Sequence, residues 1–179
     1  MIGWCDAKER NPAVKANRSL EGIAGLGLVA QIGQTVWALA GPERLPDKIP
    51  MHFDAAGNPD GWGSWPMLIL FPAIVVCIYL LMTVPVLFPS AFNNMNYPVQ
   101  VTEQNRERLQ SVALDMVTWM KAEMIWLFCW VQWAVIDVAR HGVNKMVDTV
   151  VPAAIALIVG TIGWHIWAMV RAARKTPAK

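Results

Sequence analysis

Charged residues are scarce in this chain of 179 residues: Asp, Glu, Lys and Arg make up 16% of it, and 55% is hydrophobic. A soluble domain is usually about a quarter charged, so the composition argues against that class. The formal net charge of +2 is too small to predict binding to nucleic acid. Most of the charges lie between four apolar stretches, which indicates that these stretches lie in a membrane.

Cysteine and histidine are also rare, with three of each. Cys77 and Cys129 lie inside apolar stretches and Cys5 lies in a basic arm, so we expect no structural disulfide. A haem held by two histidines would need a second histidine in the membrane beside His165, and His141 lies in a loop. No Ser-His-Asp arrangement, glycine-rich phosphate loop or paired acid motif is evident. The sequence therefore predicts no enzyme and no cofactor.

Four apolar stretches are each long enough to cross a bilayer as a helix, which takes about 20 residues. They cover residues 20–41, 66–88, 119–139 and 147–170. Apolar residues at helical spacing before the third stretch predict an amphipathic helix over about 102–118 that continues into it. The sequence therefore predicts an all-α integral membrane protein, a four-transmembrane-helix bundle with an ordered extracytoplasmic loop.

Lysine and arginine are distributed unevenly among the segments that flank this membrane domain, residues 20–171. The arm 1–19, the segment between spans two and three, and the C-terminal end from Arg171 through the tail 172–179 carry ten. Loops 42–65 and 140–146 carry four. Because short cytoplasmic segments are enriched in these residues, we expect both termini in the cytoplasm of a bacterium and both loops outside its inner membrane.

One alternative makes the first stretch a cleaved signal peptide, because Ala38-Leu39-Ala40 resembles a cleavage site. The length of the stretch and of the basic arm before it favours a span.

The outer loop 42–65 is the most specific feature of the sequence. Two consecutive turns are predicted, at 54–57 and 58–61, from Asp or Asn at the first position and Gly at the fourth. The spacing of its acidic residues does not fit an EF-hand, and a single histidine does not make a zinc site. We therefore expect an ordered cap without a metal, stiffened by prolines in and next to the loop: Pro42, Pro46, Pro50, Pro59 and Pro66.

The amino-acid sequence of this loop resembles that of an uncharacterised bacterial membrane domain with the pattern L-P-x-x-I-P-x-H-F-x-x-x-G-x-P-D-x-W-G. The matching residues are Leu45, Pro46, Ile49, Pro50, His52, Phe53, Gly57, Pro59, Asp60, Trp62 and Gly63. The same domain occurs at the N-terminus of proteins that are similar to the SdpI-type immunity proteins. The resemblance implies a multi-pass membrane location and no known chemistry.

Three surfaces are candidates for contact with a partner. In the outer loop they are Pro46, Pro50, His52, Phe53, Gly57, Pro59, Asp60, Gly61 and Trp62. Span three carries a stripe of tryptophans at helical spacing, which is either a docking surface or packing bulk: Trp119, Trp126, Trp130 and Trp133. Small residues on spans one and four are expected to pack on each other or on a partner: Gly25, Gly33, Ala156, Gly160 and Gly163.

The ionisable residues of span three, Lys121, Glu123 and Asp137, lie near its two ends, where we expect their side chains to reach the headgroup region.

The first hypothesis for the function is a non-catalytic protein that binds a peptide, lipid or protein partner through its outer loop and helix faces. The second is an accessory subunit of a larger membrane complex. A transporter or enzyme is the weakest of the three.

Overall fold

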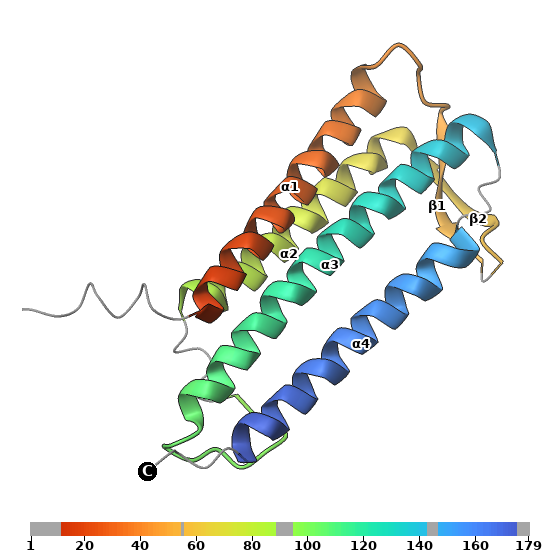
Figure 1. Cartoon of the computed structure of the whole chain (residues 1–179). Coiled ribbons are helices and arrows are strands. Elements are labelled where there is room, and N and C mark those ends of the chain that lie inside the picture. The colour runs from red at the N-terminus through yellow and green to blue at the C-terminus, as the bar shows by residue number, and fades with distance from the viewer. Residues whose placement is uncertain (1–11, 55, 89–94, 143–146, 175–179) are drawn as a thin grey trace, which may run out of the picture.

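The computed structural model describes residues 12–54, 56–88, 95–142 and 147–174 (Figure 1). Four of its helices are long and apolar enough to cross a membrane, which confirms the predicted four-helix membrane protein at that level. The elements in chain order are α1 (Pro12–Ala40), β1 (Lys48–Phe53), β2 (Pro59–Ser64), the 3-10 helix η1 (Trp65–Ile69), α2 (Leu70–Leu87), α3 (Arg106–His141) and α4 (Val147–Arg174).

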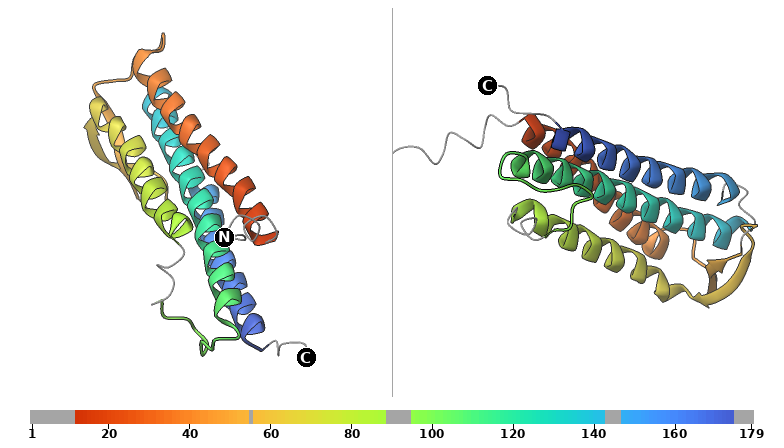
Figure 2. Two further views of the ribbon diagram at one scale, coloured as in Figure 1. Left: turned by 90° about the vertical axis from the view of Figure 1, so that its left-hand side faces the viewer. Right: turned by 90° about the horizontal axis from the view of Figure 1, so that it is seen from below.

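The third helix is the centre of the bundle. Helix α3 contacts α1, α2, α4 and the strand β1, whereas α4 packs chiefly against α3. Figures 1 and 2 show α1 and α2 on one side of α3 and α4 on the other. The predicted amphipathic segment and the third span form one uninterrupted helix of 36 residues. It begins at Arg106, because residues 102–105 form a turn in which the side chain of Asn105 accepts the backbone N–H of Thr102.

The loop between α1 and α2 contains an antiparallel hairpin of β1 and β2. The predicted turn at 54–57 is confirmed: the N–H of Gly57 donates to the carbonyl of Asp54 over 3.0 Å, and Gly57 has a φ of 77°. Glycine suits this left-handed backbone because it has no Cβ.

The predicted second turn at 58–61 is wrong, because residues 59–64 form the strand β2. The chain has already reversed at Asn58, whose carbonyl accepts the N–H of Asp54 over 2.9 Å. Pro59 is the first residue of the returning strand, a position where proline is tolerated because it has no N–H to pair.

The hairpin is fixed to one end of the bundle by an apolar cluster. Its buried members are Ala38, Ile49, Leu68, Val135 and Ile136, which come from α1, β1, η1 and α3. Arg140 of α3 also donates to the carbonyl of Glu43 over 2.9 Å and lies 4.0 Å from the centroid of the Trp37 ring. The hairpin in the loop between α1 and α2 is thus joined to α1, η1 and α3, and the loop is an ordered structure.

The expected packing of the small-residue faces of α1 and α4 on each other is wrong. A Cβ added to Gly25, Gly33, Gly160 or Gly163 would have no neighbouring atom within 4 Å. Among the glycines of α1 and α4, the close-packed one is Gly27, where a Cβ would lie 2.8 Å from the Cγ2 of Ile125 on α3. Helix α1 approaches α3 through Gly27, and the glycine face of α4 is open within the chain.

Candidate functional site

The hairpin presents a polar outer face built from both strands. His52 of β1 and Asp60 of β2 form a pair with 2.5 Å between Nδ1 and Oδ1, and their side chains are 73% and 47% exposed. Gly61 pairs with His52 in the strand register, and a Cβ at Gly61 would lie 2.9 Å from the Cβ of His52. Glycine at position 61 therefore allows the strand to approach His52 closely enough for the pair to form.

The tip of the hairpin is organised by one carboxylate. Asp54 Oδ1 accepts the N–H groups of Asn58 and Ala56 at 2.8 and 2.9 Å, and Oδ2 accepts the side-chain amide of Asn58 at 3.2 Å. The backbone and side-chain bonds from Asn58 lower the pKa of Asp54, because hydrogen bonds to a carboxylate favour its charged form. The charged carboxylate is therefore part of the turn.

The loop residues expected to bind a partner separate into two groups. The exposed group consists of Pro46, His52, Asp60 and Trp62. Pro50 and Gly57 are buried, Phe53 packs against the apolar cluster, and Pro59 and Gly61 are half-buried. The second group shapes the hairpin, and the first group is the part that a partner can reach.

The tryptophan stripe of α3 contacts two different helices. Trp126 donates from Nε1 to the carbonyl of Ile23 on α1 over 3.1 Å and lies over Gly27. Trp119 lines a cavity together with residues of α4. Trp130 is half-buried, whereas Trp133 is 37% exposed. Trp119, Trp126 and Trp133 are each more than a third exposed, so the stripe contacts α1 and α4 and still presents ring surface outside the bundle.

Lys121 does not reach the headgroup region as expected. Its side chain is completely buried, and its ammonium group pairs with Glu21 of α1 and donates to Thr83 of α2 over 3.1 Å. The same Nζ lies 4.9 Å from the centroid of the Tyr79 ring. Lys121 thus links three helices. The sequence offers one signal for this pair, opposite charges near the starts of two predicted spans.

A second buried contact joins α1 to α3 deeper in the bundle. Gln31 donates to the side-chain carbonyl of Gln132 over 2.5 Å, and Gln132 donates to the hydroxyl of Thr35 over 2.9 Å. All three residues are buried. A buried polar side chain needs such partners, so these bonds also fix the register of the two helices.

Helix α4 is held to α3 by two polar contacts. Thr161 donates to the carboxylate of Glu123 over 2.5 Å, and His165 lies 3.3 Å from Asp115 through Nε2. His165 Nδ1 is 2.7 Å from the carbonyl of Thr161, an acceptor, so this nitrogen carries a proton. His165 has partners on both nitrogens, as expected for a structural histidine.

The described residues contain no group of three or more His, Cys, Asp or Glu side chains that could hold a metal ion. The contacts above are suited to holding the helices and the hairpin in place.

Comparison with known proteins gives one match. The pattern of a domain of unknown function, DUF1648, matches residues 32–76. These residues comprise the C-terminal third of α1, the hairpin, η1 and the first part of α2. The comparisons with curated proteins and with solved structures found no match. The match supports an uncharacterised domain family for the hairpin and its two flanking helices.

Proposed function

We propose that the protein is a non-catalytic membrane protein whose hairpin binds a peptide or a segment of another protein outside the cytoplasm. The observation that carries this proposal is the fixed position of the hairpin. Its apolar side packs on α1, η1 and α3, and its other side exposes His52, Asp60 and Trp62. A preorganised surface loses little conformational entropy when it binds, which favours recognition.

The open edge of β2 favours an extended ligand. In the part of the chain that the structure describes, β2 pairs only with β1, and every residue from Pro59 to Ser64 is half-buried or exposed. An extended peptide can pair with such an edge through its backbone, while side chains beside the strand provide specificity. The exposed Trp62 would offer an apolar contact and the His52–Asp60 pair a polar one.

The proposed place of binding follows from charge. The ten lysines and arginines at one end of the spans against four at the other favour cytoplasmic termini in a bacterial inner membrane. The hairpin would then face the extracytoplasmic side, as would be needed to meet a peptide from outside. The resemblance of the loop to that of SdpI-type immunity proteins also favours this reading.

Reporter fusions test the orientation. Fusions after residues 55 and 143 should report the outside, and fusions after residue 97 and at the C-terminus the inside. The reverse pattern would place the hairpin in the cytoplasm and would contradict the proposed function.

A second candidate is an accessory subunit of a larger membrane complex. The open face of α4 favours it, because Gly160 and Gly163 have no neighbour at a Cβ position and Trp164 is 62% exposed. Small residues on such a face let a second helix approach closely.

Photo-crosslinking in native membranes separates the two candidates. A photoreactive phenylalanine analogue at Trp62 should give a discrete adduct that Asp60→Lys removes. The same analogue at Trp164 should give one only if α4 docks on a partner helix. Leu81, which is 71% exposed on α2, is the matched lipid-facing control. Adducts from Trp164 without any from Trp62 would reject the hairpin as the binding surface and favour the subunit.

A further inference from the structure

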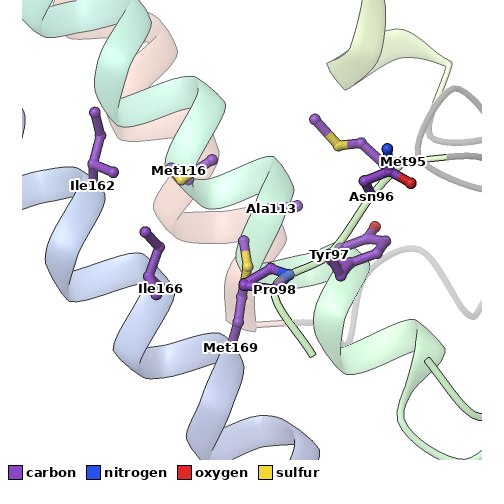
Figure 3. Close-up of a pocket in the computed structure, with 9 residues that line it drawn as sticks. All are labelled: Met95, Asn96, Tyr97, Pro98, Ala113, Met116, Ile162, Ile166 and Met169. Carbon is purple, nitrogen blue, oxygen red and sulfur yellow. The ribbon is translucent and has the colours of Figure 1, made fainter. Parts of the chain in front are cut away.

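A cavity lies between α3, α4 and the segment 95–98 that precedes α3 (Figure 3). Its volume is about 340 Å³, within the range of roughly 300–1,000 Å³ that is usual for ligand sites. Figure 3 shows Met116 of α3, Ile162, Ile166 and Met169 of α4, and Pro98 converging on this space. The walls are mainly hydrocarbon and thioether groups, which suit an apolar ligand and adapt to its shape.

The base of the cavity is fixed and its rim is open. Leu109, Ala113 and Met169 form a buried cluster, and Tyr97 packs against it from the segment 95–98. At the rim, Ile166 is 43% exposed and Met95 is 45% exposed. A flexible chain could therefore enter from the lipid side and end on a fixed apolar floor.

Positive charge lies beside this cavity. Helix α3 begins with Arg106, which is exposed and has no ion-pair partner among the residues that the structure describes. Arg106 acts on Tyr97: burial raises the pKa of this tyrosine, and the nearby guanidinium opposes the rise. Arg108, Arg171 and Arg174 lie at the same end of the bundle, together with the acidic Glu103 and Glu107. The named arginines therefore outnumber the two glutamates at this end of the bundle.

We propose that this cavity binds one acyl chain of an anionic phospholipid, with the lipid phosphate held at Arg106. The apolar wall and the adjacent cation match the two parts of such a lipid, and both lie where a span meets its polar flank. The lipid comes from the membrane leaflet that surrounds the start of α3 and the end of α4. This site is at the opposite end of the bundle from the hairpin and does not depend on the hairpin function (Figure 1).

Two pairs of variants isolate the two halves of the site. Ile166→Trp adds bulk at the rim of the cavity, and Val159→Trp adds the same residue to an exposed position of α4 that does not line it. Arg106→Gln removes the cation next to Tyr97. Arg44→Gln removes an exposed arginine at the opposite end of the bundle, in the segment between α1 and β1.

Native mass spectrometry of the full chain in mild detergent measures the outcome, with added dioleoyl-phosphatidylglycerol or dioleoyl-phosphatidylcholine. We expect one phosphatidylglycerol to bind in preference to phosphatidylcholine, and Ile166→Trp to abolish this binding while Val159→Trp retains it. Arg106→Gln should weaken it about fivefold, the factor that one surface arginine contributes, with no such loss for Arg44→Gln. Thermal melting of each variant identifies any that fail to fold, and the milder Ile166→Phe then replaces Ile166→Trp.

Three results would overturn the proposal. The first is equal binding of the two lipids, and the second is unchanged phosphatidylglycerol binding in the folded cavity-filling variant of Ile166. The third is a dimer that Ile166→Trp dissociates, because the cavity would then hold a second copy of the chain.

Discussion

The buried ion pair of Lys121 and Glu21 gives the sharpest prediction, because the two partners differ in their access to solvent. The side chain of Lys121 is 0% exposed and that of Glu21 is 25% exposed. Glu21→Gln would leave a buried ammonium group with only the Thr83 hydroxyl, the Tyr79 ring and a neutral amide nearby. Lys121→Met would leave the carboxylate of Glu21, which is partly exposed and not enclosed by the bundle. We therefore expect Glu21→Gln to be the more destabilising of the two substitutions.

The magnitude follows from what each substitution leaves unpaired. Removing one partner of a buried pair costs about 3–5 kcal/mol, so Glu21→Gln should lower the free energy of unfolding by about 3 kcal/mol. Partial exposure of Glu21 should reduce the effect of Lys121→Met to about 2 kcal/mol. Thr83→Val removes one neutral acceptor from Lys121 and should cost about 1 kcal/mol. The double variant Glu21→Gln/Lys121→Met should be more stable than the sum of its single effects predicts, by about 2 kcal/mol.

Unfolding in mixed micelles, followed by far-ultraviolet circular dichroism, measures all four variants on one scale. An additive double variant would mean that the two side chains do not interact and would refute the pairing. A larger loss for Lys121→Met than for Glu21→Gln would refute the argument from exposure while leaving the pair itself intact.

Two further predictions concern the helix interface and the hairpin. Gly27→Leu should destabilise the bundle by about 1–3 kcal/mol through overpacking against Ile125, and Gly25→Leu, which meets no neighbour, should be neutral or slightly stabilising in the same unfolding assay. Equal effects would show that α1 does not approach α3 at Gly27. The pKa of Asp54 is lowered, so its carboxylate stabilises the hairpin at pH values above the usual pKa of aspartate. This contribution is lost as the pH falls through the pKa of Asp54 in the folded state. Nuclear magnetic resonance titration should give Asp54 a midpoint below that of an unstructured aspartate, and Asn58→Ala should raise it; an unchanged midpoint would contradict the role of Asn58.

Local patterns in the sequence were sufficient to predict the helices and part of the loop. A run of apolar residues about 20 long is constrained to be helical in a membrane, because every backbone group must be bonded within the segment. Apolar spacing likewise predicted that the segment before the third span would continue into it as one helix, now seen as α3. The turn at 54–57 was predictable because Asp and Gly act on the backbone only a few residues away.

The second turn of the loop shows where local patterns are insufficient. Residues 58–61 have suitable turn chemistry, but the pairing of β2 with β1 places Pro59 in a strand. Which of two adjacent turns closes a hairpin depends on the strand register, and here the burial of Ile49 against Leu68 and α3 favours one register.

The sequence by itself determined that the chain has four apolar helices, their approximate limits and an ordered loop after the first. Only the tertiary structure decided that Gly27 is the close contact, that Lys121 is buried, and that the glycines of α4 remain open. The physical reason is the range of the interactions. Hydropathy and turn preferences act within a segment, whereas the partner of Lys121 is 100 residues away in sequence. Such a contact depends on which helix faces meet, and a single sequence does not contain that information in any local pattern.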